Sequence, residues 1–369
     1  MPRANPTLKG HRLINLFGVT GPPLLVLGAV FQPSWIAQLK DLFPDLEIVS
    51  NQDESRDGDE FLKEISEDEW REATIIVTGK TLPEPELLPN LRYIQLQTAG
   101  ANHMLNHPSV TGTRAALCTA SGIHGPSIAE WVLATFLASR HRILQYAEFQ
   151  KKATWNKLGV PIPDSVGQRV GILGYGAVGR QVARVFKAIG MHVSACTLRK
   201  RETADSRKHD GYTPPGCGDP DGSLPSEWFA AGTEEELHAF LRSGLDVLVV
   251  TVPLTPKTRK IIGRTEFSLL AEQKTFVSNV SRGEVIDTDA LIEALEGDLI
   301  SGAALDVTDP EPLPDGHRLW HTKNVIITPH VSGDSGAYAR GVFEVLKDNL
   351  IKLSKGQDLS NTVNLKEGY

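Results

Sequence analysis

Three polar segments follow apolar runs in the last third of the chain, and each carries a side chain suited to acid–base chemistry. Arg282 lies in NVSRGEVID, Glu311 in LDVTDPEPLP and His330 in ITPHVSG. The carboxyl ends of strands in an open α/β sheet meet at the ligand crevice, so we expect these side chains to converge. Reduction of a carbonyl needs a proton donor, a partner that keeps the donor protonated, and a cation for an acid group. We therefore predict that His330 donates the proton, Glu311 orients it, and Arg282 binds the acid.

A glycine motif precedes these segments and points to a dinucleotide. Three glycines form G-x-G-x-x-G between an apolar run and a helical pattern that ends at Gly190. The first permits a tight turn, the second lets a pyrophosphate approach the backbone, and the third lets helix and strand pack closely. The anion would bind at the helix N-terminus. The candidate cofactor-binding loop consists of Gly174, Tyr175, Gly176, Ala177, Val178 and Gly179.

The residues about 20 positions further on favour NADP(H), with NAD(H) as the disfavoured alternative. An Asp or Glu at this position would accept hydrogen bonds from the ribose 2′-hydroxyl. This chain has Thr197, followed after Leu198 by Arg199, Lys200 and Arg201. A carboxylate would repel a 2′-phosphate, whereas a hydroxyl and cations can bind it. The other interpretation is that these cations form a solvated start to the segment that follows.

Composition excludes several other classes of protein. The chain has 38 Lys and Arg against 45 Asp and Glu, a net charge of −7 that disfavours nucleic-acid binding. No run reaches the roughly 18 apolar residues of a membrane span. Three cysteines without CxxC spacing indicate neither disulfides nor a zinc site, so no metal and a cytoplasmic location are expected. Organellar targeting stays open because residues 1–40 contain no Asp or Glu; we prefer an irregular arm there.

Strand and helix patterns alternate along the chain, which predicts an α/β fold with parallel, doubly wound sheets. A Gly- and Pro-rich segment at 211–222 must be a loop, and a long apolar helix over 127–144 marks a domain boundary. The acidic segment 53–72 is expected to be a solvated loop and helix face. Expected strands are 24–28, 47–50, 74–78, 93–97, 169–176, 191–197, 245–253, 275–280, 300–307 and 324–330, with further helices at 34–43, 234–242 and 335–353.

Several segments together resemble the D-isomer-specific 2-hydroxyacid dehydrogenases, and in particular their glyoxylate and hydroxypyruvate reductase branch. The matching segments are QLQTAGANHM, GIHGPSIAEWVLA, GILGYGAVG, VTVPLTPKTRKII, NVSRGEVIDTDAL, ALDVTDPEPLP and TPHVSG. The resemblance implies two Rossmann-like domains, with the nucleotide domain (123–330) inserted into a discontinuous substrate domain (1–122 with 331–369). It also implies a homodimer.

The resemblance also implies roles for individual residues. Arg282, Glu311 and His330 take the substrate-binding, tuning and acid–base roles already inferred from their chemistry. Backbone N–H groups of the loop Thr98, Ala99, Gly100 and Ala101 would bind the substrate carboxylate. The cofactor groove would be lined by Val252, Pro253, Thr258, Val280, Asp306 and Gly333, with Asp306 on the nicotinamide side. Three features depart from the family pattern: Thr197 where many members have Asp, His124 where Asn is common, and an insertion after Arg201.

Two classes of function remain after this reasoning. The first is an NADPH-dependent reductase that converts a 2-oxo acid into a D-2-hydroxy acid. The alternative is a dinucleotide-sensing corepressor resembling the C-terminal-binding proteins, which keep the Arg-Glu-His set; those sensors read NAD, so Thr197 and the cations after it favour the enzyme. Formate dehydrogenase is disfavoured because that enzyme has Gln where Glu311 stands.

Overall fold

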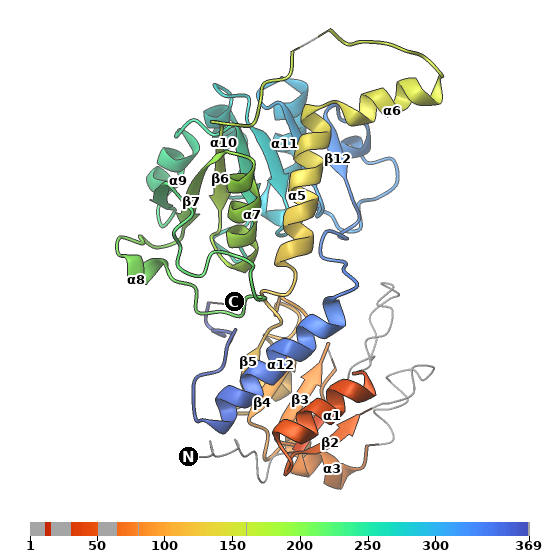
Figure 1. Ribbon diagram of the computed structural model, residues 1–369, viewed down its shortest axis with the longest axis vertical. Helices are drawn as coiled ribbons and strands as arrows, with labels where there is room; N and C mark the ends of the chain where they lie inside the picture. Colours follow the sequence, from red (N-terminus) through yellow and green to blue (C-terminus); the bar gives the residue numbers. More distant parts are fainter. Residues whose placement is uncertain (1–11, 16–30, 51–64, 80, 160, 368–369) are drawn as a thin grey trace. The chain divides into compact units, whose positions relative to one another are not determined.

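The computed structural model describes residues 12–15, 31–50, 65–79, 81–159 and 161–367 (Figure 1). The chain divides into two compact units, residues 1–123 with 335–369 and residues 124–334. The boundaries inferred from the sequence were 122/123 and 330/331. One unit is therefore continuous, and the other is assembled from both ends of the chain.

The first unit contains a five-stranded parallel sheet with the strand order β2-β1-β3-β4-β5. This order is one of the two common doubly wound arrangements. Its strands are β1 (Arg12–Asn15), β2 (Glu47–Ser50), β3 (Ile75–Thr78), β4 (Tyr93–Leu96) and β5 (Ala116–Cys118). Its helices are α1 (Pro33–Leu42), α3 (Glu67–Glu72), η1 (Pro85–Leu87), α4 (Pro108–Thr111) and α12 (Tyr338–Ser354).

The N-terminal part of this unit differs from the expected irregular arm. The irregular arm is wrong at Arg12–Asn15, which forms β1 between β2 and β3. Polar residues at both ends of this four-residue strand leave too short an apolar pattern to recognise. The expected strand at 24–28 and most of the acidic segment lie outside the described residues, although Glu67–Glu72 forms a capped helix as expected.

The C-terminal helix α12 packs in the first unit, as the absence of a following strand predicted. Phe343 is 1% exposed and contacts Phe31 edge-on, with ring centroids 5.7 Å apart. Buried residues of α12 share one apolar cluster with Leu39 of α1 and Tyr93 of β4. Burial of such side chains stabilises the fold by about 1.5–3 kcal/mol each. The buried face of α12 is therefore part of this unit's core.

The second unit is a seven-stranded parallel sheet with the strand order β12-β11-β10-β9-β6-β7-β8. The strands are β6 (Arg169–Leu173), β7 (His192–Thr197), β8 (Glu227–Ala230), β9 (Val247–Val250), β10 (Phe276–Asn279), β11 (Gly302–Leu305) and β12 (Val325–Ile327). Six of them match the expected strands. The seventh, β8, is an additional edge strand that follows the insertion. It is only four residues long and begins with the exposed Glu227, so it lacks the long apolar run of the other strands.

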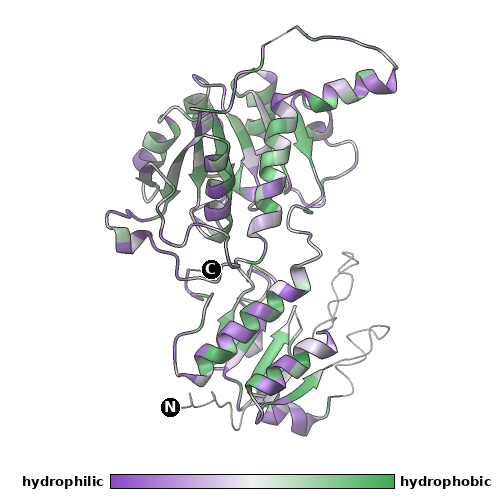
Figure 2. Cartoon of the chain, in the orientation of Figure 1, coloured by the Kyte–Doolittle hydropathy of each residue, from purple (hydrophilic) through white to green (hydrophobic). Residues whose placement is uncertain are grey.

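Helices cover both faces of this sheet, and each face has its own apolar cluster (Figure 1). On one face lie α5 (Gly125–Arg140) and α7 (Ala177–Ala188); on the other lie α9 (Glu234–Leu241), α10 (Arg264–Leu270) and α11 (Thr288–Glu296). Figure 2 shows the hydrophobic strands between these amphipathic helices. The shorter elements are α6 (Ile143–Lys151), α8 (Ala204–Arg207), η2 (Gly283–Val285) and η3 (Arg318–His321).

The helix expected over 127–144 is shorter than predicted. It ends at Arg140, and Arg142 has a φ of 55°, a left-handed conformation that breaks the helix before α6 begins at Ile143. An apolar pattern alone does not reveal such a break. The segment 211–222 forms neither helix nor strand, as expected.

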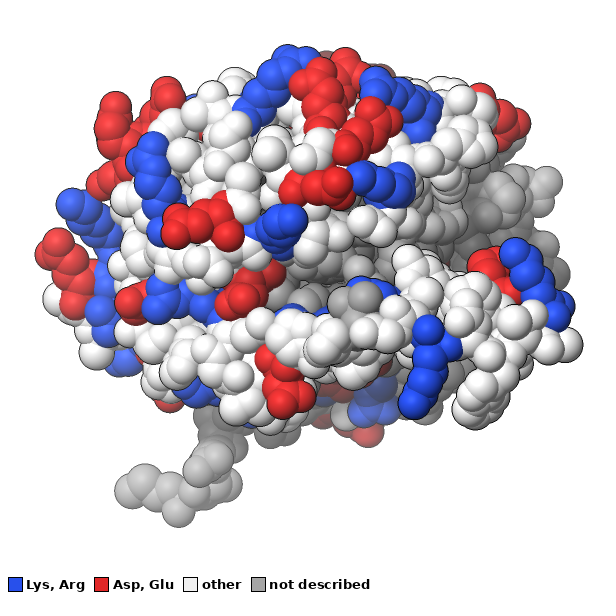
Figure 3. All heavy atoms as spheres, turned by 90° about the horizontal axis from the view of Figure 1, so that it is seen from above, with Lys and Arg blue, Asp and Glu red and all other residues white. Residues whose placement is uncertain are grey.

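The surface carries charges of both signs (Figure 3), and the helices are those of a chain without a membrane-spanning helix among its described residues. On the face drawn in Figure 3, Lys and Arg side chains are interspersed with Asp and Glu. Among the described residues, no helix is both long enough and apolar enough to cross a bilayer.

Candidate functional site

His330 and Glu311 lie together in the second unit. His330 Nδ1 is 2.7 Å from Glu311 Oε1, and the two side chains are 47% and 41% exposed. The hydrogen bond that Glu311 accepts from His330 raises the pKa of His330 above its ordinary value, against the opposing effect of partial burial. The same bond lowers the pKa of Glu311. The imidazolium form of His330 is therefore stabilised by a neighbouring carboxylate.

The turn that carries His330 is held by Asp306, at the end of β11. Asp306 is 1% exposed, and its carboxylate accepts hydrogen bonds from the Thr328 hydroxyl at 2.6 Å and from the backbone N–H groups of Val331 and Ser332 at 2.9 Å. The His330 N–H donates to the Asp306 carbonyl at 2.8 Å. His330 itself has a φ of 58°. A buried carboxylate thus fixes an unusual backbone conformation at His330.

Arg282 follows β10 and is partly buried. Its carbonyl accepts a hydrogen bond from Asn279 Nδ2 at 3.0 Å, and its Nη1 donates to the Ser281 carbonyl at 2.6 Å. Its charge adds to the dominant hydrogen bond in lowering the pKa of Glu311, and it opposes the rise in the pKa of His330. The structure therefore brings all three residues into one electrostatic neighbourhood.

The glycine loop after β6 fits a phosphate group. Gly174 has a φ of 102°, and a Cβ there would lie 2.8 Å from the Thr251 backbone. A Cβ on Gly179 would lie 2.2 Å from the Gly174 carbonyl oxygen, so neither position tolerates a side chain. Gly176 is exposed, with open space around it, and no side chain caps the N-terminus of α7 at this residue. Backbone N–H groups at this helix end, including those of Ala177 and Val178, suit an anion.

The Tyr175 side chain does not face that open space. It is 4% exposed, and its hydroxyl donates to Asp219 Oδ2 at 2.7 Å. Only the Tyr175 backbone is left for the cofactor contact predicted from the motif. The contact with Asp219 was not foreseen, because nothing in the local pattern links residues 44 positions apart.

The segment after β7 presents the residues expected to read the ribose. The Thr197 hydroxyl donates to the Arg199 carbonyl at 2.7 Å, and Arg199 and Lys200 are exposed. Lys200 Nζ lies 3.7 Å from Glu236 Oε1. Arg201 donates to the Ser206 carbonyl, so this part of its guanidinium is committed to the insertion.

The other predicted groove residues lie in two loops and a turn. After β9, Val252 is half-buried and the Thr258 hydroxyl donates to the Pro253 carbonyl at 2.7 Å. After β10, Val280 packs against the α5–α7 side of the core. Gly333 follows the His330 turn.

His124 packs directly against this turn. A Cβ on Gly333 would lie 3.0 Å from His124 Cδ2. Burial, together with the charge of His330, lowers the pKa of His124 to about 4.

The loop Thr98–Ala101 follows β4 in the first unit. The Thr98 hydroxyl donates to the Gly100 carbonyl at 2.7 Å, and the Ala120 N–H donates to the Thr98 carbonyl at 2.9 Å. The loop is thus ordered from within its own unit. Its contact with a substrate carboxylate stays a prediction.

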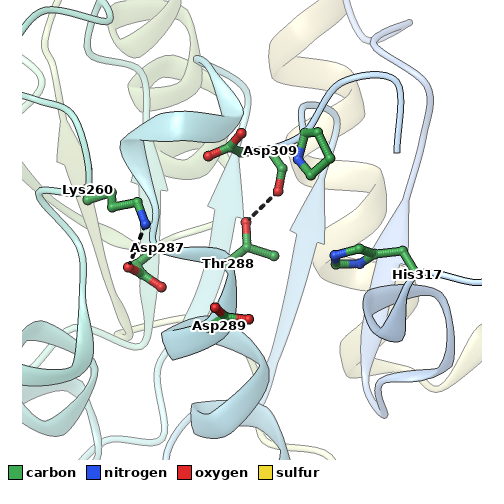
Figure 4. Close-up of a pocket in the computed structure, with 7 residues that line it drawn as sticks. Lys260, Asp287, Thr288, Asp289, Asp309 and His317 are labelled. Carbon is green, nitrogen blue, oxygen red and sulfur yellow. Dashed lines mark hydrogen bonds and ion pairs between the residues drawn. The ribbon is translucent and has the colours of Figure 1, made fainter. Parts of the chain in front are cut away.

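A shallow pocket of about 230 Å³ lies beside the loops after β10 and β11, but it holds none of the predicted site residues (Figure 4). Asp287 caps α11 by accepting the Ala290 N–H and pairs with Lys260 at 3.1 Å. The Thr288 hydroxyl donates to the Asp309 carbonyl at 2.9 Å. These groups satisfy one another, so we assign the pocket no chemistry. The described residues hold no cluster of three or more His, Cys, Asp or Glu suited to a metal.

Comparison with known proteins identifies the family. The sequence profile of the D-isomer specific 2-hydroxyacid dehydrogenase NAD binding domain matches residues 133–214 and 225–332. The chain belongs to this 2-hydroxyacid dehydrogenase family. Residues 215–224, which the profile does not cover, lie in the segment between β7 and β8. A family member binds NAD(P) and is an oxidoreductase that interconverts 2-hydroxy and 2-oxo acids.

Relatives and solved structures agree with this assignment. The chain is 30% identical over 254 residues to a glyoxylate reductase from Aeropyrum pernix, covering 66% of this chain and 68% of that one. It is 29% identical over 307 residues to an uncharacterized protein from Corynebacterium melassecola, covering 81% and 91% of the two chains. An NADPH-dependent glyoxylate/hydroxypyruvate reductase from Sinorhizobium meliloti, solved with NADP and sulfate, has the same fold, with a TM-score of 0.70, 24% identity, and coverage of 97% and 100%.

Proposed function

We propose that this 2-hydroxyacid dehydrogenase uses NADPH to reduce a 2-oxo acid, of the glyoxylate or hydroxypyruvate kind or bulkier, to the D-2-hydroxy acid. The observation that carries the proposal is the 2.7 Å contact between His330 and Glu311. When bound, the nicotinamide supplies a hydride to the carbonyl carbon. All other steps fall to side chains and backbone groups of the protein.

His330, kept protonated by Glu311, donates a proton to the carbonyl oxygen as the alkoxide develops. Arg282 binds the substrate carboxylate and stabilises negative charge near that oxygen. Asp306 holds the His330 turn, so the imidazole direction is set before substrate arrives. Backbone N–H groups of Thr98–Ala101 are proposed as further donors to the carboxylate. On this proposal the second unit is the nucleotide domain and the first is the substrate domain.

The preference for NADPH is supported by the end of β7. The structure has a hydroxyl at Thr197 and exposed cations at Arg199 and Lys200 where a carboxylate would select NAD. The structure of the Sinorhizobium meliloti reductase was solved in complex with NADP, which is in keeping with this preference.

We also propose a homodimer. Large apolar side chains are exposed on and after α6: Ile143 at 52%, Leu144 at 54% and Trp155 at 97%. Such side chains on a short helix and the segment after it are typical of association surfaces. Sedimentation equilibrium of the wild type and of Trp155→Ser tests this: a monomeric wild type would refute it.

One set of assays tests the reaction. Purified protein is mixed with NADPH or NADH and a panel of 2-oxo acids of increasing size, and nicotinamide absorbance is followed. We expect oxidation of NADPH, a higher kcat/KM with NADPH than with NADH, and a loss of about 10²–10⁴-fold in kcat for His330→Ala with NADPH binding retained. Dinucleotide binding without turnover of any acid would refute the reaction and favour the sensor alternative. Equal kcat/KM with the two cofactors would refute the NADPH preference.

A further inference from the structure

The insertion between β7 and β8 is docked on α7 by a specific set of hydrogen bonds. The Gly218 N–H donates to Gln181 Oε1 at 2.6 Å, and Arg184 Nε donates to the Gly218 carbonyl at 2.7 Å. Arg180 donates to the carbonyl of Asp219. Three side chains of one helix thus bind two consecutive residues of the insertion. A loop that merely decorated the surface would not need such contacts.

Asp219 connects this docked insertion to the glycine loop. Asp219 is 3% exposed, and its Oδ2 accepts the hydroxyl of Tyr175 at 2.7 Å. The backbone N–H groups of Ser223 and Leu224 also donate to the carboxylate, at 3.0 Å and 3.1 Å. Burial, followed by the contact with Asp219, raises the pKa of Tyr175, so the phenol remains a donor at all working pH values.

The same network extends to the segment that would read the ribose. Arg180 is 2% exposed, lies over the Tyr175 ring at 5.0 Å, and donates through Nη2 to the Arg207 carbonyl at 2.6 Å. Arg207 Nε donates to the Arg201 carbonyl at 2.9 Å, and Arg201 donates back to the Ser206 carbonyl. A continuous series of hydrogen bonds therefore joins the glycine loop (174–179) to the segment 197–201.

We propose that Tyr175, Asp219 and Arg180 are positioning residues that hold the glycine loop and the segment 197–201 in register for the adenosine end of the cofactor. The identity of the ligand, a dinucleotide cofactor, rests on the proposed function. Two loops that bind one ligand lose less conformational freedom on binding when they are already tied together. The insertion thus raises cofactor affinity by holding the two loops in place, and it takes no part in the hydride or proton steps.

The test uses Asp219→Asn, with Tyr175→Phe as a milder second variant that removes one hydroxyl. Asp221→Asn is the matched control, because it removes the same charge at an exposed side chain two residues away. Hydrogen exchange is first measured without cofactor. We expect amides in 174–179 and in 197–201 to exchange about tenfold faster in both variants than in the wild type and the control, with β10 unchanged. An unchanged rate in 197–201 would overturn the coupling.

The second measurement is the Kd of NADPH and of 2′,5′-ADP, which carries only the adenosine end. In each variant, the Kd of NADPH and the Kd of 2′,5′-ADP should rise by the same factor, which we expect to be about fivefold to tenfold. The kcat of Asp219→Asn at saturating NADPH should stay within about twofold of wild type. A lowered Tm with unchanged Kd values would show a merely structural role and overturn the inference. A rise in the Kd of NADPH without a rise in the Kd of 2′,5′-ADP would also overturn it.

These outcomes separate the inference from the proposed reaction. If the wild type binds both probes but reduces no 2-oxo acid, the reaction is refuted, while the two Kd ratios still decide the inference. If the wild type binds neither probe, the inference is overturned together with the cofactor assignment.

Discussion

Replacement of Glu311 by Gln tests the proton donor most directly. Glu311→Gln keeps the size of the side chain but removes the negative charge 2.7 Å from His330 Nδ1. The carboxylate is the main reason that the pKa of His330 is raised above 6.5. A group with a raised pKa is fully protonated below the ordinary value, and it loses its proton as the pH rises through the raised one. Reduction should therefore have an alkaline limb, and this limb should move to lower pH in the variant.

The size of the effect follows from the exposure of the pair. A short charge-assisted hydrogen bond is stronger than a neutral one, but both side chains are more than 40% exposed and solvent screens their charges. We take about 1 kcal/mol as the coupling free energy, which corresponds to about fivefold in rate. The ratio of wild-type to variant kcat should then grow about fivefold between the acid plateau and the alkaline limb.

The assay is kcat for NADPH-dependent reduction across the pH range at saturating substrate, with the His330 ring titrated by NMR in parallel. Glu293→Gln is the control, because Glu293 forms a similarly exposed ion pair with Arg264 at 2.6 Å. The control should leave the profile unchanged. An alkaline limb at the same pH in wild type and Glu311→Gln would refute the assignment of His330 as the general acid tuned by Glu311.

The same pair gives a small pH dependence to stability. The contribution of Glu311 is present above its ordinary pKa of 4.5 and is lost as the pH falls through its lowered value. The contribution of His330 is present below 6.5 and is lost as the pH rises through its raised value. The pair therefore stabilises the fold fully only between about 4.5 and 6.5.

Three further substitutions test other parts of the site. Thr197→Asp should lower the NADPH-to-NADH ratio of kcat/KM by about tenfold or more, since a carboxylate repels the 2′-phosphate; an unchanged ratio would exclude this position from cofactor selection. Arg282→Gln should lower kcat/KM for the 2-oxo acid by about 10- to 100-fold with the Kd of NADPH unchanged, and a weaker effect in steady-state assays would count against carboxylate binding. Asp306→Asn should lower the free energy of unfolding by about 2 kcal/mol, because buried N–H groups lose an acceptor; urea denaturation with an unshifted midpoint would contradict this.

The sequence predicted most of the second sheet because its strands are buried on both faces. Runs such as Val247–Val250 are wholly apolar, and parallel strands between two helix layers must be so. β8 was missed because it is an edge strand with an exposed Glu227, and β1 because its apolar centre is only two residues long. A run of apolar residues in the sequence indicates that a strand is buried on both faces. Edge strands and very short strands bury few side chains, so their sequences lack such a run.

The three residues of the candidate site were found because each follows a strand and has a side chain with obvious chemistry. The expected place of Asp306 on the nicotinamide side stays a prediction, and the sequence did not reveal that its carboxylate holds the His330 turn. Tyr175 was placed by its motif alone, and its bond to Asp219 depends on how the insertion between β7 and β8 folds back. Such contacts arise from tertiary packing, which no local pattern encodes.

The position of α12 in the core of the first unit has a consequence for biosynthesis. The second unit is one continuous stretch, so its sheet can form as soon as residue 334 has left the ribosome. The N-terminal part of the first unit is synthesised earlier, yet the apolar cluster that includes Phe31 and Tyr93 is incomplete until Phe343 and its neighbours on α12 emerge. The N-terminal unit is therefore the last to complete its fold. A nascent chain that stalls before residue 343 would expose that cluster to aggregation or to chaperones.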